Sequence, residues 1–212
     1  MMKILSHRGY WKTIEEKNSL VAFERSFELG FGTETDVRDH NGTLVISHDI
    51  PRGGEILFGD FLDMAANYSD SANPITLALN IKADGLSEKV AASLKNYQQL
   101  DCFVFDMSVP DMRSYFSENV AVFTRMSEVE TIPVWLEKSS GIWLDSFDHD
   151  WLGVDELKVI LESKKRVCIV SSELHQRTHL PLWSVLKACS QDDRPMLCTD
   201  FPEDAQLFFR KN

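Results

Sequence analysis

The chain has 212 residues, of which 43% are hydrophobic and 26% are charged, as in an ordinary folded protein. Its formal net charge of −11 argues against a nucleic-acid backbone or an anionic membrane as a partner, because both would be repelled. No apolar stretch is long enough for a membrane span, and the first residues do not read as a signal peptide. The four cysteines show no CxxC spacing, which favours reduced thiols in a reducing compartment. We therefore expect a cytoplasmic protein.

Short apolar runs alternate with amphipathic segments along the whole chain. The runs predict strands at residues 3–6, 33–37, 75–81, 102–106, 120–124, 142–145, 166–170 and 196–199. The segments between them predict helices at residues 19–29, 58–66, 87–97, 111–116, 155–163, 181–188 and 202–209, with a short or missing helix after the fifth strand. Asn18 is placed to cap the first helix and Gly30 to end it. A hairpin that turns at Asn41-Gly42 and returns along residues 43–47 follows the second strand.

This alternation predicts a parallel sheet, and eight units in one chain favour a (β/α)8 TIM barrel formed by a single domain, residues 1–212. An open, doubly wound sheet is the competing topology, since periodicity alone does not separate the two. Nearly every predicted strand ends in polar residues on its carboxyl side. In a barrel these ends meet on one face, which is where active sites lie.

Two groups of polar residues follow the first two strands. His7 can titrate near neutral pH, and Arg8 beside it can bind a phosphate through two parallel hydrogen bonds. Glu34 and Asp36 are two residues apart, so they face the same side of a strand and repel each other. Burying such a pair requires a cation or a shared proton, and oxygen ligands favour Mg²⁺ or Ca²⁺. A strand-end histidine is more often structural, so none of these residues decides the function by itself.

The same spacing recurs on the third strand, where Asn80 is followed by Lys82, whose ammonium would complement a phosphate oxygen. The hairpin ends in His48-Asp49, so the histidine is carried back toward the same face and Asp49 is available to orient its ring. Trp135, Trp143 and Trp151 fall in the fifth-to-sixth region, where core packing is the more ordinary explanation for aromatic residues.

Taken together, these motifs resemble the amino-terminal signature of the glycerophosphodiester phosphodiesterase family, which belongs with the phosphatidylinositol-phospholipase-C-like phosphodiesterases. The matching elements are His7-Arg8-Gly9, Asn18, Ala22-Phe23, Gly30, Glu34-x-Asp36-Val37, Asn41-Gly42, Leu44-Val45 and His48-Asp49. Thr199-Asp200-Phe201-Pro202 is similar to the family's carboxyl-terminal element.

The resemblance implies a (β/α)8 barrel that binds a divalent cation, Mg²⁺ or Ca²⁺, and hydrolyses a small phosphodiester such as a glycerophosphodiester. By position, it implies His7 and His48 as the general acid and base, in an unassigned order. It also implies cation ligands on the second strand and phosphate contacts on the first and third. The ligands would be Glu34 and Asp36, and the phosphate contacts Arg8 and Lys82.

Two departures from the family pattern alter these expectations. Asn80 stands where the family usually has a glutamate, so it is at most a neutral third ligand, and the cation should bind more weakly unless another carboxylate compensates. Asp106, Asp145 and Glu173 end neighbouring strands and are the candidates for that role. The connection from His48 to Asn80 is short, which predicts a reduced insertion and a more open mouth.

Two alternative functions are compatible with the same barrel. One is a non-catalytic protein that binds a phosphate-bearing ligand, and the other is a metal-dependent lyase or isomerase. Retention of both His7 and His48 favours the phosphodiesterase, because binding alone does not require a titrating pair.

Overall fold

The structure is a computed structural model that describes residues 2–189, 191–192 and 194–210. It divides into two compact units, one formed by Ser6–Val122 and the other by the described residues of Met1–Leu5 and Phe123–Asn212. The strands are β1 (Lys3–His7), β2 (Gly32–His40), β3 (Thr43–Ile46), β4 (Thr76–Ile81), β5 (Asp101–Phe105), β6 (Phe123–Met126), β7 (Gly141–Leu144), β8 (Arg166–Val170) and β9 (Pro195–Thr199). The helices are η1 (Ile14–Glu16), α1 (Leu20–Glu28), α2 (Phe58–Asn67), α3 (Ser87–Leu94), α4 (Val109–Ser117), α5 (Val154–Glu162), η2 (Ser172–His175), α6 (Leu180–Ala188) and α7 (Pro202–Phe209).

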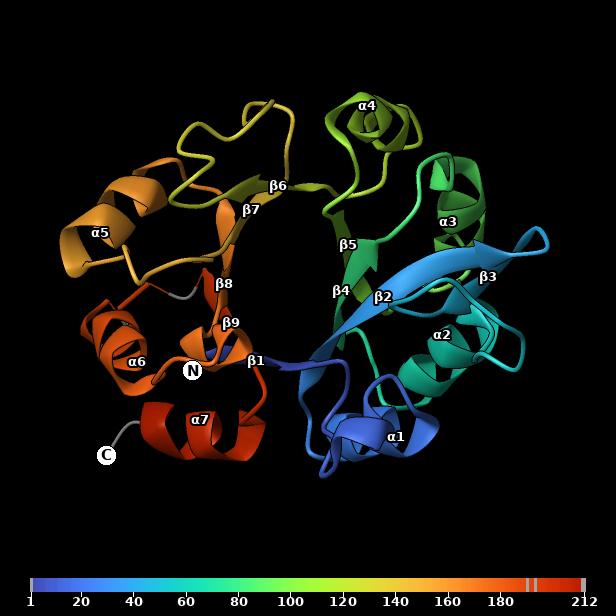
Figure 1. The fold of residues 1–212 in the computed structure, drawn as a ribbon, viewed down its shortest axis with the longest axis horizontal. Helices are drawn as coiled ribbons and strands as arrows, with labels where there is room; N and C mark the ends of the chain where they lie inside the picture. Colours follow the sequence, from blue (N-terminus) through green and yellow to red (C-terminus); the bar gives the residue numbers. More distant parts are fainter. Residues whose placement is uncertain (1, 190, 193, 211–212) are drawn as a thin grey trace. The chain divides into compact units, whose positions relative to one another are not determined.

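The strands of the described chain follow one another in the order β5-β4-β2-β1-β9-β8-β7-β6, and β3 pairs with β2 outside this order. The first and last strands are therefore neighbours, and the order runs through the chain without reversing. A doubly wound sheet would instead reverse its strand order at a switch point. Helices follow most of the strands (Figure 1), so the arrangement is that of a (β/α)8 barrel, as predicted.

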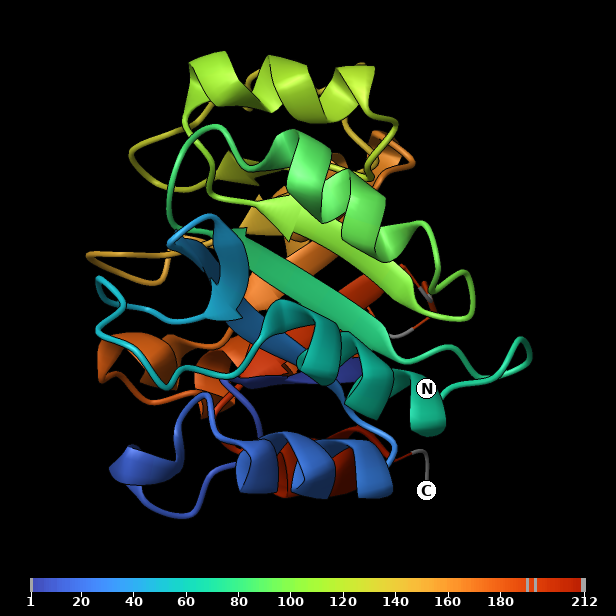
Figure 2. The ribbon, with the colours of Figure 1, turned by 90° about the vertical axis from the view of Figure 1, so that its right-hand side faces the viewer.

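In the unit Ser6–Val122, β2 pairs in parallel with β4, and β4 pairs in parallel with β5. All six residues of β4 are buried, as expected of a strand covered on both faces. Helices α1, α2 and α3 lie along the outer side of these strands (Figure 2). Phe23 of α1 and Phe61 of α2 have no exposed surface, and their ring centroids are 4.7 Å apart, so burial of aromatic surface joins the two helices.

In the other unit, β6, β7, β8 and β9 pair in parallel in that order. Trp183 of α6 is 1% exposed and lies 5.9 Å from the ring of Phe209 in α7, so this large side chain joins the last two helices. Residues 127–140, between β6 and β7, contain no helix, in agreement with the short or missing helix predicted there. All four cysteines are free thiols. No helix in the described residues is both long and apolar enough to cross a membrane.

Two local predictions need correction and one is confirmed. Asn18 does not cap α1: Ser19 does, because its Oγ accepts a hydrogen bond from the backbone N–H of Ala22 at 3.4 Å. Gly30 does end the helix, and its φ of 76° is a conformation that favours glycine. Strand β2 continues to His40, beyond its predicted end, because its antiparallel pairing with β3 extends that far.

The turn of this hairpin has positive φ at both central residues, 49° at Asn41 and 83° at Gly42, as the tight turns of two-residue hairpins require. Between β3 and β4 the structure contains a single helix, α2, so the connection is as short as the sequence indicated.

Candidate functional site

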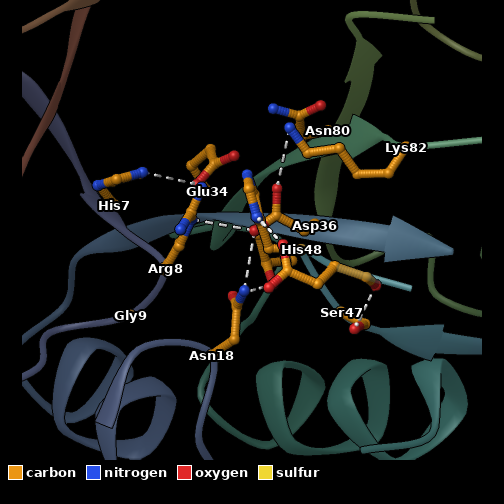
Figure 3. A network of polar contacts seen from close by, with 12 residues as sticks. His7, Arg8, Gly9, Asn18, Glu34, Asp36, Ser47, His48, Asn80 and Lys82 are labelled. Atoms are coloured by element: carbon orange, nitrogen blue, oxygen red, sulfur yellow. Dashed lines mark hydrogen bonds and ion pairs between the residues drawn. The ribbon is translucent and has the colours of Figure 1, made fainter. Parts of the chain in front are cut away.

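Glu34 and Asp36 lie side by side on β2, and both are almost completely buried, with 3% and 0% of their surface exposed. The register of the sheet places Asp36 opposite Asn80 of β4. Because alternate residues of a strand face the same side, Glu34, Asp36 and Asn80 share one face of the sheet. Figure 3 shows the three side chains in one cluster with His7, Arg8, His48 and Lys82. The structure thus brings together the side chains that the sequence singled out.

Asp36 is surrounded by donors. Its Oδ2 lies 3.0 Å from Nε of Arg8, and its Oδ1 lies 3.3 Å from Nζ of Lys82. The amide of Asn18 donates a further hydrogen bond to Oδ2 at 2.8 Å. Two cations and an amide therefore compensate a carboxylate that has no contact with water. Arg8 and Lys82 are themselves only about a fifth exposed, so these ion pairs are poorly screened by solvent.

Glu34 is in a less favourable environment than Asp36. Its Oε2 lies 4.0 Å from Nε2 of His7, too far for a hydrogen bond. Burial, and then the neighbouring charge of Asp36, raise the pKa of Glu34 from 4.5 to about 8, and the positive charges of Arg8 and Lys82 offset this only in part. Without a bound cation, Glu34 is therefore mainly protonated at neutral pH.

One oxygen of each of the three expected ligands is buried and accepts no hydrogen bond within the described chain: Oε2 of Glu34, Oδ1 of Asn80 and Oδ1 of Asp36, the last of which has the Lys82 ammonium 3.3 Å away as an ion pair. The other end of the Asn80 amide, Nδ2, donates to Asp106 at 3.3 Å, which leaves the amide oxygen for another partner. Buried oxygens without a donor are costly, and a hard cation satisfies such atoms. The residues present therefore fit a divalent cation. In the described residues no group of three or more His, Cys, Asp or Glu is placed to hold a metal, so the Asn80 amide would have to contribute.

The backbone after β1 is shaped to present His7 and Arg8. Arg8 and Gly9 both have positive φ, 57° and 81°, and a Cβ on Gly9 would lie 2.8 Å from Cβ of Ala22, so only glycine fits there. Thr33 fixes the turn, because its Oγ1 accepts from the Gly9 N–H at 3.0 Å and donates to the Ser6 carbonyl at 2.9 Å. The Arg8 N–H also donates to the Glu34 carbonyl at 2.9 Å. The arginine is thus tied to the acidic strand.

Asn18 has a role that the sequence analysis missed. Its φ is 57°, its N–H donates to the Arg8 carbonyl at 2.9 Å, and its Oδ1 accepts from the Thr35 hydroxyl at 2.8 Å. Together with the hydrogen bond to Asp36, these contacts join the loop before α1 to β2. The adjacent residues Asn18 and Ser19 could have indicated this role. Both residue types cap helices, and a helix needs only one cap, so the other residue was available for a different contact.

His48 follows the hairpin, and two backbone contacts position it. Ser47 N–H donates to the Asp36 carbonyl at 3.0 Å, and Arg38 Nε donates to the His48 carbonyl at 3.1 Å. Nδ1 of the imidazole lies 2.8 Å from Oδ1 of Asp49, as expected of an orienting carboxylate. The side chain of His48 is 46% exposed and lines a pocket of about 630 Å³ together with Arg8.

The other carboxylates considered as compensating ligands have different surroundings. Asp106 lies beside Asn80. Asp145 is paired with Nε2 of His175 at 2.7 Å, and Glu173 accepts hydrogen bonds from the hydroxyls of Ser171 and Thr199, so both are satisfied within the unit that contains β6–β9. Trp143 is 4% exposed in β7, which agrees with a role in the core.

The fold and these side chains define a class: a (β/α)8-barrel protein with a buried acidic pair, two neighbouring cations and two histidines in one cluster.

Solved structures of the same fold include a glycerophosphodiester phosphodiesterase from Agrobacterium tumefaciens, with a TM-score of 0.67 and 16% identity over 99% of both chains. A glycerophosphodiester phosphodiesterase from Thermotoga maritima matches with a TM-score of 0.64 and 14% identity over 98% of both chains. A Ca²⁺-dependent phosphatidylinositol-specific phospholipase C from Streptomyces antibioticus matches with a TM-score of 0.63 and 10% identity over 99% of this chain and 96% of that one. These likenesses show the fold that the family resemblance of the sequence motifs implied. No protein-family model and no curated protein sequence matches the chain.

Proposed function

We propose that this protein is a divalent-cation-dependent phosphodiesterase that hydrolyses a small organic phosphodiester. The observation that carries the proposal is the set of three buried oxygens that accept no hydrogen bond, one each from Glu34, Asp36 and Asn80, beside the cations of Arg8 and Lys82, which form ion pairs with Asp36. An acidic pocket for a cation next to basic side chains suits a ligand that carries phosphate. The phosphodiesterases among the structures of the same fold support the same reaction class.

In this proposal, Glu34, Asp36 and Asn80 would hold Mg²⁺ or Ca²⁺, which would supply positive charge against the charge that develops on the phosphoryl oxygens. Arg8 and Lys82 bind the phosphate through charge-assisted hydrogen bonds and fix its orientation. Both side chains contact Asp36 now, so their cationic ends have to share that carboxylate with the substrate.

His7 and His48 act as the acid and base: one protonates the departing alcohol and the other removes the proton of the attacking hydroxyl. For His48, the contact with Asp49 occupies Nδ1, so Nε2 is the atom left to exchange a proton with the substrate. His7 presents Nε2 on the side of Glu34, and it is only 15% exposed. The two imidazoles therefore differ in their access to water, and different environments of this kind can give two similar groups the separate roles of acid and base.

Hydrolysis of bis(p-nitrophenyl) phosphate tests the proposal. We expect turnover that requires Mg²⁺, Ca²⁺ or Mn²⁺, is abolished by a chelator, and falls at least about 100-fold in His7→Ala and in His48→Ala. His149→Ala is the matched control, because this histidine is exposed in a loop of the other unit. Turnover that survives both site substitutions would contradict the proposed roles.

A non-catalytic protein that binds a phosphate-bearing ligand is the second candidate. One observation favours it: Asn80, a neutral amide, lies opposite Asp36 at the position of a third ligand, so the site carries one negative charge fewer than three carboxylates would supply. Calorimetry with inorganic phosphate and with methyl phosphate separates the two candidates. Binding that disappears in Arg8→Ala, together with no turnover of any diester under any cation, would establish the binding protein instead.

A further inference from the structure

A pocket of about 630 Å³ opens beside Arg8 and His48, within the unit Ser6–Val122. Its size is in the range of small-molecule sites. The first turn of α1 and the residues around the end of β3 form its walls. Because Arg8 and His48 both line it, a diester held by Arg8 would direct one of its two alcohol groups into this pocket.

Polar and aliphatic residues both line the pocket. The polar ones are Lys17, Ser19, Ser47, Asp49 and Glu55 together with Arg8, Asn18 and His48. The aliphatic residues are Leu20, Val21, Ile46 and Ile56.

Leu20 and Val21 are unusual among these aliphatic residues. They are the first two residues of α1, a position where polar and acidic residues are favoured by the helix dipole, and the first turn of α1 contains no acidic residue. Both side chains remain half exposed, at 49% and 47%. The hydrophobic core therefore does not account for them, since α1 packs through Phe23 and Phe27 instead.

We propose that this pocket binds an alkyl group of the substrate, so that the preferred diester joins phosphate to an apolar alcohol rather than to free glycerol alone. The proposal rests on the proposed function, because the phosphate must lie at Arg8 for the alcohol to reach Leu20 and Val21. An alkyl chain covers the exposed aliphatic surface and gains about 0.8 kcal/mol per buried CH₂, which is about a fourfold change in affinity.

A series of p-nitrophenyl alkyl phosphates tests this substrate class. The leaving group stays the same while the second alcohol grows from methyl to propyl to hexyl. We expect kcat/KM to rise about threefold to fourfold per added CH₂ until the pocket is filled. Equal kcat/KM along the series would overturn the proposal, while leaving the phosphodiesterase activity itself in place.

Two pocket variants, Leu20→Ser and Val21→Thr, locate the effect. The ratio of kcat/KM for the hexyl diester to that for the methyl diester should fall at least about fivefold in each. Leu207→Ser and Val159→Thr are the matched controls: both residues are exposed on helices of the other unit, at 61% and 65%, and the ratio should not change. A preference for hexyl that persists in the pocket variants would also overturn the proposal, because the chain would then bind elsewhere.

Calorimetry with hexyl phosphate and methyl phosphate covers the case in which no diester is hydrolysed. Hexyl phosphate that binds more tightly than methyl phosphate, with the difference lost in Leu20→Ser, would support the apolar pocket even though the proposed activity had failed. Equal affinity for the two compounds would count against the pocket. Dimerisation of the protein that is lost in Leu20→Ser would show that a second copy covers the exposed side chains of Leu20 and Val21, and would likewise overturn the proposal.

Discussion

Replacing Glu34 by glutamine should change how the stability of the cation-free protein depends on pH. In the folded protein the pKa of this carboxyl is raised from 4.5 to about 8, chiefly by burial, so folding favours its protonated form. A group of this kind contributes its full stability below about pH 4.5 and loses it as the pH rises toward 8. The loss is at most 1.4 kcal/mol per pH unit, or about 5 kcal/mol across the whole interval. Glu34 is 3% exposed, so solvent does not reduce this figure appreciably.

Urea unfolding between about pH 5 and pH 8 in the presence of a chelator measures this effect. Glutamine keeps the shape of the side chain and does not ionise, so the free energy of unfolding of Glu34→Gln minus that of the wild type should grow with pH, by roughly 1 kcal/mol per pH unit. Titrations of groups that do not interact with Glu34 cancel in the difference. Added Mg²⁺ or Ca²⁺ should restore stability at pH 8 to the wild type but not to the variant. A difference that is the same at every pH would refute the reasoning, because it would mean that Glu34 is already charged in the folded protein.

Three further substitutions test the same site. Asp36→Asn should destabilise the protein by about 3 kcal/mol in urea unfolding, because two partly buried cations lose their carboxylate. The control is Asp39→Asn, at an exposed position of the same strand. Equal effects of the two substitutions would argue against the ion pairs. Gly9→Ala should lower the melting temperature more than Gly85→Ala, since both residues have positive φ but only Gly9 has close neighbours around its missing Cβ. Asn80→Asp should tighten Mg²⁺ or Ca²⁺ binding in isothermal titration, because it adds charge to the ligand set; unchanged or weaker affinity would remove this residue from that set.

Much of the fold could be predicted because it depends on local patterns. Runs of apolar residues gave the eight parallel strands, and the Asn41-Gly42 turn indicated the hairpin. The bounds were less accurate where pairing with a neighbouring strand decided them. Strand β2 reaches His40 only because β3 pairs with it that far, and no property of residues 38–40 alone contains this information.

The site was predictable in its members but not in their contacts. Spacing placed Glu34 and Asp36 on one face, and the order of the strands added Asn80. Arg8 and Lys82 both form their ion pairs with Asp36 rather than with Glu34. This choice of partner depends on how the loops bend in space. The different environments of the two carboxyl groups follow from these bends, which a sequence does not display.

The hairpin of β2 and β3 also makes the chain suitable for engineering. The two strands pair from Val37 with Ile46 to His40 with Thr43, and the turn at Asn41-Gly42 is the far end of this ribbon from Asp36 and Ser47. Removing one pair of opposed residues would shorten the ribbon and keep its register, whereas deleting a single residue would turn every side chain of β3 to the opposite face. A fluorescent label or an affinity epitope could therefore be inserted at the tip without moving the end of the hairpin that carries Asp36 and Ser47.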